Sequence, residues 1–298
     1  MSYASPLSHR SEATGALIPC RRGSIWNVSE AAQTSDLPVA TPGDTVDEIV
    51  VGSKRSGNGF PVRQTFLQRR ADDGEPRPGP LGSLVAAGDL RALQLFLLLL
   101  TKASSAPWDA GLPAAVWARA LGLPMPNSKT ATSTISKTWL RLEGHGLVSR
   151  ERRKRMAIVT LRCEDGSDKP YTAPGEVGER YLKVPFALWQ LGPDAGHRWY
   201  QELSLAELAV LLIARSHGDG FRLPYEFGPR WYGVSADTLH RGVARLSTRG
   251  LLAIDKTFKK APLSPLGYTA EHRYTLQAPF GPIGKASASR FHRLVNSR

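Results

Sequence analysis

The sequence predicts a mainly α-helical α+β fold in which two similar units each end in a small β-hairpin. Three observations support this prediction. A strongly apolar helical segment begins just after a Pro/Gly-rich boundary at 74–82. Two further helical segments, the first of them short, and a pair of β-prone runs follow it, and the same order of segments occurs again from residue 203. The length of 298 residues suits about two compact domains.

The first helix of the first unit is expected to begin near Asp89. An aspartate there precedes a run of good helix formers, "LRALQLFLLLLTK", that is apolar on nearly every side. Such a helix belongs in the centre of a core. A second, short helix is expected over 114–123, where "AAVWARALGL" runs into the helix-stopping "GLPMP".

The third helix is expected within 127–146, with Asn127 or Ser128 as its N-cap. Its apolar residues Ile135, Trp139 and Leu142 have the i, i+4, i+7 spacing that faces a core. The remaining face carries hydrogen-bond donors and no carboxylate. These donors are Lys129, Thr132, Ser133, Ser136, Lys137 and Arg141.

A basic β-hairpin is expected directly after this helix. The runs "LVSRERR" and "MAIVTLR" favour strands and meet near Lys154. Four consecutive cations therefore lie near the predicted tip, namely Arg152, Arg153, Lys154 and Arg155.

The second unit repeats this order. A helix is expected from Leu203, a short second element over 224–233 and a third helix with Ser235 as its N-cap. With a constant offset of 104 positions, the end of this helix and the following strand match those of the first unit. The polar residues of this helix are Thr238, His240, Arg241 and Arg245, and those near the bend of its hairpin are Lys256, Lys259 and Lys260.

The order helix, helix, helix, hairpin resembles the winged-helix superfamily. Two copies in one basic chain resemble the tandem winged-helix replication initiators of plasmids, and the fold is also that of many transcription regulators. The resemblance covers about residues 84–278 and rests on "STISKTWLRLEGHGLVSRERRKR" and "DTLHRGVARLSTRGLLAIDK". It implies that each third helix enters the major groove of DNA and that each hairpin, or wing, reaches the backbone or minor groove.

Two features of the third helices leave open that some of these residues do not contact DNA. Arg141 and Arg245 lie late in their helices, where a cation also interacts favourably with the helix dipole. Asp237 lies among the first residues of its helix and would repel phosphate.

The net charge of +13 favours a polyanionic partner, either nucleic acid or an anionic membrane surface. Residues 1–80 have no net charge, whereas 81–164 carry +7 and 165–298 carry +6. The positive charge therefore belongs to the two predicted units rather than to a basic arm.

The expected organisation is a largely disordered arm and linker at 1–82, winged-helix units at 83–164 and 181–278, a linker at 165–180 and a basic tail at 279–298. Within the arm, 47–55 is expected to form a short strand or a docking motif.

Enzymatic motifs find little support. The phrase "GPIGKAS" departs from a phosphate-binding loop, and no His or Cys spacing suits a metal. Cys20 and Cys163 lie far apart, the N-terminus lacks an apolar signal sequence, and Leu95–Leu100 is too short to span a bilayer. We therefore expect a cytoplasmic, nucleoid-associated protein that is not an enzyme and needs no cofactor or metal.

The predicted function is sequence-specific binding of double-stranded DNA, with a transcriptional regulator narrowly favoured. The alternatives are a plasmid-type replication initiator that binds repeated sites and a winged-helix scaffold that binds proteins. Double-stranded DNA is the expected partner, and a homodimer remains open. The sequence indicates no membrane partner and no identifiable small-molecule ligand.

Overall fold

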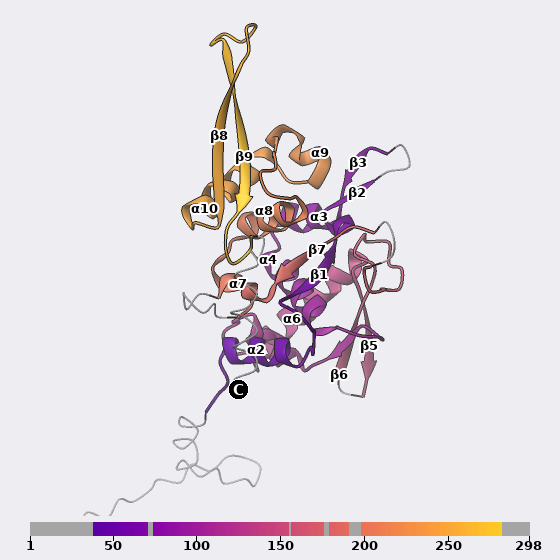
Figure 1. Ribbon diagram of the computed structural model, residues 1–298. Helices are drawn as coiled ribbons and strands as arrows, with labels where there is room; N and C mark the ends of the chain where they lie inside the picture. Colours follow the sequence, from indigo (N-terminus) through magenta and orange to yellow (C-terminus); the bar gives the residue numbers. More distant parts are fainter. Residues whose placement is uncertain (1–37, 71–73, 155, 176–178, 191–197, 282–298) are drawn as a thin grey trace, which may run out of the picture. The chain divides into compact units, whose positions relative to one another are not determined.

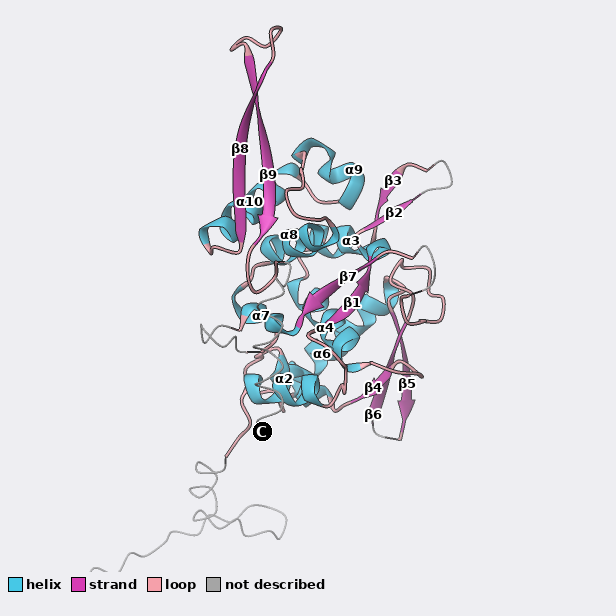
Figure 2. Ribbon diagram, viewed as in Figure 1, coloured by secondary structure: helices cyan, strands magenta, loops and turns pink. Residues whose placement is uncertain are grey.

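The computed structural model describes residues 38–70, 74–154, 156–175, 179–190 and 198–281 (Figure 1). The described residues from 40 to 281 belong to one compact unit, which the description below concerns. Its described part contains nine α-helices and small antiparallel sheets of two or three strands (Figure 2). None of the described helices is long and apolar enough to cross a bilayer. The predicted α+β fold with two winged-helix units is confirmed.

The first winged-helix unit follows the predicted order of elements. Asp89 caps its first helix by accepting a hydrogen bond from the amide of Ala92 at 3.0 Å, and Ser128 caps its third helix. A three-stranded sheet of order β4-β6-β5 closes the unit. Its elements are α4 (Leu90–Lys102), β4 (Asp109–Gly111), α5 (Ala114–Ala120), α6 (Lys129–Gly144), β5 (Val148–Arg153) and β6 (Met156–Leu161).

The basic run 149–162 forms the predicted hairpin, which we call wing 1. β5 and β6 pair in register from Val148↔Leu161 to Arg153↔Met156. Only two residues therefore connect the strands, and Lys154 takes a left-handed φ of 57° in this tight turn.

The second winged-helix unit has the same design with a longer hairpin, which we call wing 2. Ser204 and Glu207 form a capping box at the start of its first helix. An isolated bridge between Phe221 and Tyr274 takes the place of β4. The elements are α8 (Leu205–Ser216), η4 (Tyr225–Phe227), α9 (Gly228–Tyr232), α10 (Ala236–Thr248), β8 (Leu252–Lys260) and β9 (Tyr268–Leu276).

The third helices of the two units end in the same way. Gly146 and Gly250 have φ of 66° and 71°, and the next residue donates back to Leu142 and Leu246, respectively. α6 has 16 residues and α10 has 13, so the predicted offset of 104 positions holds at the helix ends but not at the N-caps.

Further elements join the two units. β1 pairs with β7 in antiparallel register from Gly59↔Pro185 to Arg63↔Tyr181, and a 3₁₀ turn follows each strand. The remaining elements are α2 (Pro42–Val51), β1 (Gly59–Arg63), η2 (Gln64–Phe66), β2 (Gln68–Arg70), β3 (Pro76–Pro78), α3 (Pro80–Ala86), β7 (Tyr181–Pro185), η3 (Phe186–Leu188) and α7 (Trp199–Glu202).

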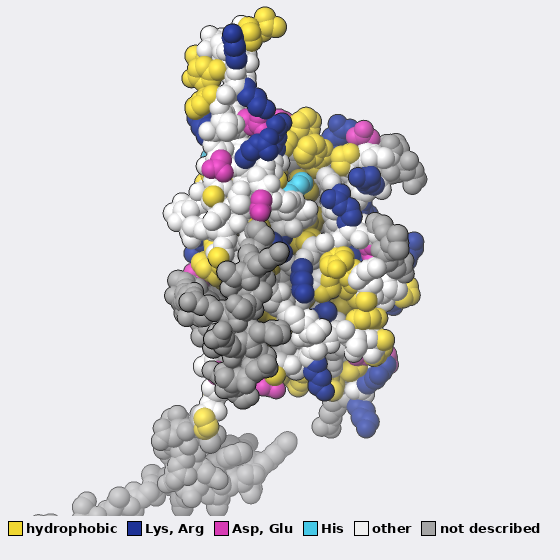
Figure 3. All heavy atoms as spheres, in the orientation of Figure 1, with side chains coloured by type: hydrophobic (Ala, Val, Ile, Leu, Met, Phe, Trp, Pro, Cys, Tyr) yellow, Lys and Arg dark blue, Asp and Glu magenta, His cyan; other side chains and the backbone are white. Residues whose placement is uncertain are grey.

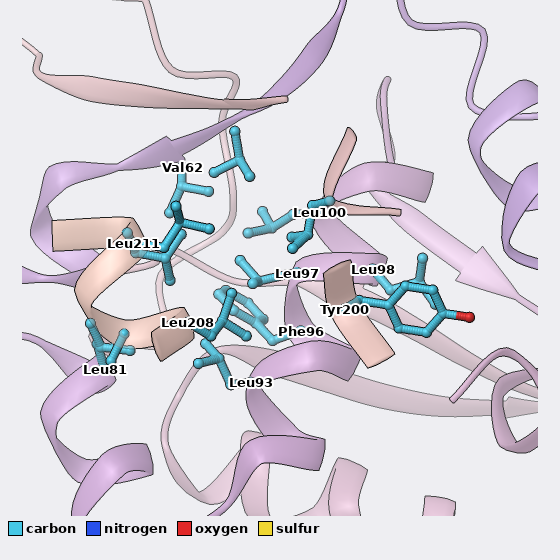
Figure 4. Packing of buried hydrophobic residues seen from close by; sticks show 14 of the residues in the cluster. Val62, Leu81, Leu93, Phe96, Leu97, Leu98, Leu100, Tyr200, Leu208 and Leu211 are labelled. Carbon is cyan, nitrogen blue, oxygen red and sulfur yellow. The ribbon is translucent and has the colours of Figure 1, made fainter. Parts of the chain in front are cut away.

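The cores of the two winged-helix units are continuous. Figure 4 shows Leu208 and Leu211 of α8 packed with Phe96 and Leu97 of α4, beside Val62 of β1. All five side chains are buried, so apolar burial couples the stability of the two units.

The predicted arm and linker at 1–82 require correction over 40–70 and 74–82. Val46, Phe60 and Phe66 of this segment are fully buried in the shared core. The 47–55 segment is not a strand. Residues 47–51 belong to α2, which begins with a capping box of Thr41 and Asp44, and residues 52–54 form a turn. The part of the prediction on residues 1–37 lies outside the described residues.

Parts of the predicted linker at 165–180 and of the predicted tail from 279 pack into the hydrophobic core. Tyr171 is buried and lies with its ring edge-on to Trp108 at 5.3 Å between centroids. Phe280 is fully buried and contacts Trp199. Residues 282–298 lie outside the described residues.

Candidate nucleic-acid interface

Helix α6 separates a buried face from an exposed polar face. Ile135, Trp139 and Leu142 are buried as predicted, and Trp139 packs edge-on against Trp117 of α5 at 5.4 Å. The opposite face exposes Lys129, Ser133, Ser136 and Lys137. The helix therefore presents two lysines and several hydroxyl groups to solvent along one side.

The hydroxyl groups of α6 are partly engaged within the helix. Thr132 Oγ1 donates to the carbonyl of Ser128 at 2.9 Å, and Ser136 Oγ donates to that of Thr132 at 3.1 Å. Their oxygens keep lone pairs that accept hydrogen bonds. This face therefore offers acceptors for exocyclic amino groups of bases beside lysine donors for phosphates or guanine.

Arg141 holds α6 against α4. Its Nε lies 2.5 Å from Asp89 Oδ2, and its side chain is about half exposed. Burial alone would raise the pKa of Asp89, but the hydrogen bonds from Arg141 and from the amide of Ala92 outweigh it and lower the pKa. This contact gives Arg141 a structural role in addition to the predicted DNA contact.

The second unit has an equivalent ion pair, but from a different arginine. Arg249, at the end of α10, places its Nε 2.6 Å from Glu207 of the α8 capping box. Arg245, which the sequence aligns with Arg141, is exposed and forms no ion pair within the described part of the chain. Arg245 is therefore available to a ligand in a way that Arg141 is not.

The remaining predicted residues of α10 lie at its exposed N-terminal part. Arg241 pairs with Asp237 at 3.1 Å, which offsets the negative charge expected to repel phosphate. Thr238 lies half-buried beside them, and its amide donates to Ser235 of the N-cap. His240 is exposed and lies edge-on to the ring of Tyr225 at 5.8 Å.

Arg150 fixes wing 1 to α6. Its guanidinium lies 2.7 Å from Glu143 Oε2 and also donates to the carbonyl of Ser136 at 3.3 Å. Arg152 is two positions further along β5 and so projects from the same face of the strand. Arg153 pairs with the exposed Glu151 at 3.0 Å, Lys154 is exposed at the turn, and Arg155 lies outside the described residues.

The predicted lysines of wing 2 are exposed but differ in their partners. Lys256 lies over the ring of Phe258 at 5.2 Å, and Lys259 pairs with Glu271. Lys260 is exposed at the end of β8. The wing is therefore basic on β8, and Glu271 neutralises part of this charge.

Each unit thus brings its own third helix and wing together. The sequence-based prediction missed Arg150, although its position just before the cation run pointed to a basic hairpin. It missed Arg222 and Arg273 too, which both pair with Glu271. It also missed Arg70 of β2, which is exposed on a strand in the segment assigned to the arm. Among the described residues, no group of three or more His, Cys, Asp or Glu could hold a metal ion.

Comparison with known protein families, curated proteins and solved structures finds no match to this chain. A proposal about function therefore rests on the fold and on the exposed polar residues of α6 and α10.

Proposed function

We propose that this protein binds double-stranded DNA sequence-specifically and reads one site with two different recognition helices, α6 and α10. The observation that carries the proposal is the repeated arrangement of a third helix with an exposed polar face followed by a basic wing. The residues of α6 from Lys129 to Lys137 include no carboxylate, and Glu143 near the end of the helix is paired with Arg150. The net charge of +13 favours a polyanion, whereas a protein-binding scaffold would not need it.

The direct connection between the units favours binding of one DNA site by both recognition helices of the same chain. β1 pairs with β7, and one apolar core runs through both units. A single chain therefore carries both recognition helices in a common body. Since α6 and α10 differ in sequence, we propose that one chain binds a site whose two halves differ.

This mode makes a replication initiator a specific second candidate beside the transcriptional regulator. A regulator that dimerises on DNA favours a palindrome, because the symmetry of the site mirrors that of the protein. A chain with two unlike winged helices can bind a non-palindromic site as a monomer, and copies of such a site can be repeated in one direction, which is the arrangement that an initiator uses.

Binding of the full chain to duplex DNA is expected to depend strongly on salt. If ~6–8 phosphates are contacted, the logarithm of the affinity should fall against the logarithm of the salt concentration with a slope of roughly −5 to −7. Fluorescence anisotropy with a labelled duplex over a series of KCl concentrations measures the slope. Undetectable or salt-independent binding would contradict the proposed function.

Lys137→Ala is expected to weaken binding to a selected duplex by about 10-fold, because a bidentate base contact typically supplies ~1–3 kcal/mol of discrimination. The loss should be smaller on a duplex of random sequence. Lys54→Ala, which removes an exposed lysine just after α2, provides the control and should bind as the wild type does. Equal losses for both variants would argue against α6 as a reading helix.

A further inference from the structure

The far end of wing 2 is apolar, which is unusual for an exposed loop. Hydrophobic side chains gather at the tip of the β8–β9 hairpin (Figure 3). Leu263 is fully exposed, and Leu266, Phe258 and Tyr268 are 72%, 61% and 44% exposed. Such a cluster on an extended hairpin marks an interaction site rather than a packing surface.

The tip has a defined backbone. The amide of Ala261 donates to the carbonyl of Gly267 at 2.8 Å, and that of Ser264 donates to Ala261 at 2.9 Å. Ser264 Oγ donates to the carbonyl of Tyr268 at 3.0 Å. Each exposed leucine follows a proline, whose ring fixes φ. The leucines are therefore presented by an ordered loop, which lowers the entropic cost of binding.

One face of wing 2 alternates cations with aromatic side chains. Lys260 lies opposite Tyr268 in the ladder, so they share a face with Lys256 and Phe258. The ring of Phe258 lies edge-on to Tyr268 at 5.3 Å and below the ammonium of Lys256. The acidic residue Glu271 lies on the opposite face.

The same face leads to the recognition helix. Tyr274 continues this face toward the base of the hairpin, and its hydroxyl lies 2.9 Å from that of Tyr225. The ring of Tyr225 in turn contacts His240 of α10. At the base of the hairpin, this face of wing 2 is therefore on the α10 side.

The charge of the outer hairpin favours a polyanion as the occupant. From the Lys256↔His272 pair to the tip, the described hairpin contains three lysines and one carboxylate, Glu271, which pairs with Lys259 on the opposite face. From Lys256 to Lys260 the strand rises ~14 Å, in four steps of about 3.4 Å, and the loop with Leu263 and Leu266 lies beyond it. The tip can therefore reach across half a turn of duplex, ~17 Å, which separates a major groove from the neighbouring minor groove.

We propose that the tip of wing 2 inserts Leu263 and Leu266 into the minor groove next to the α10 half-site and partly unstacks a base step. Lys256 and Lys260 contact the flanking phosphates, and the duplex bends away from the inserted leucines, toward the major groove. This inference rests on the proposed function and specifies how the second unit binds.

The test uses the full chain and a duplex recovered with it from a random pool. 2-Aminopurine replaces the adenines that flank the α10 half-site one at a time, and donor and acceptor dyes at the duplex ends report the bend. The variant Leu263→Ser/Leu266→Ser is compared with Val39→Ser/Val51→Ser, which removes exposed valines outside the winged-helix units. Thermal unfolding should be unchanged in both, because all four side chains are exposed.

The wild type and the valine control should raise 2-aminopurine fluorescence severalfold at one step and bend the duplex. The leucine variant should show no rise, a smaller bend and about 10-fold weaker binding, with an unchanged salt slope because its cations remain. A leucine variant that still unstacks and bends DNA would overturn the inference. So would a variant that loses only self-association, since the tip would then contact a second copy. Failure of the wild type to bind any duplex would instead overturn the proposed function itself.

Discussion

Glu164→Ala is expected to lower the free energy of unfolding by ~3–5 kcal/mol, the usual effect of removing one partner from a buried ion pair. Glu164 is fully buried, and its Oε2 lies 2.7 Å from the guanidinium of Arg63, which is 4% exposed. Glu164 also accepts a hydrogen bond from the amide of Arg63 at 3.0 Å. Without this carboxylate, the buried guanidinium is left with its ion pair to Glu179, whose side chain is 26% exposed.

The effect should extend to both winged-helix units, because Arg63 ends the strand that pairs with β7. Urea unfolding followed by circular dichroism measures it. Glu151→Ala removes a carboxylate from an exposed pair with Arg153 and should change stability by less than about 1 kcal/mol. Glu164→Gln keeps the side-chain shape and one acceptor, so its loss should be intermediate. If the Glu164→Ala protein is as stable as Glu151→Ala, the ion pair between Arg63 and Glu164 does not hold β1 in place.

Arg152→Ala/Arg153→Ala/Lys154→Ala is expected to weaken duplex binding by about 100-fold at ~0.1 M salt and to reduce the salt slope by ~2–3. These cations lie on wing 1, which Arg150 fixes to α6 through Glu143. Because we propose that they contact phosphates, the loss of affinity should be nearly the same for selected and random sequences.

The matched control removes three exposed lysines outside the third helices and wings, Lys54, Lys169 and Lys183, by substitution with alanine. It changes the net charge by the same amount and should lower affinity far less. If both triple variants lose affinity equally, the dependence arises from net charge alone, and wing 1 has no local role in binding.

Most of the helices could be predicted because their signals are local. Asp89, Ser128 and Ser235 are N-caps in the structure, and the periodic apolar residues of α6 and α10 are buried. The two wings follow helix-ending glycines and β-prone runs, so both were also predictable.

The elements that join the units could not be predicted in the same way. β1 and β7 have five residues each and pair across more than one hundred positions, so neither shows a periodic pattern. α2 was missed because its β-branched residues suggested a strand, although Thr41, Pro42 and Asp44 provide a local start signal.

The candidate site was predictable in composition but not in its contacts. The sequence indicates cations at 141 and 245 but not that Arg141 pairs with Asp89, 52 positions away, whereas Arg249 forms the equivalent pair in the second unit. The apolar tip of wing 2 resembled an ordinary Pro-containing loop. Its significance depends on the length of β8 and β9, since these strands carry Leu263 and Leu266 away from the core.

The most direct test of the central claim combines selection from a random duplex library with the stoichiometry of the selected complex. We predict a site with two half-sites of different sequence at a fixed spacing, bound by one chain per duplex in light scattering or native mass spectrometry. A palindromic site bound by two chains would contradict reading by two recognition helices of one chain, and recovery of no enriched duplex would contradict sequence-specific DNA binding.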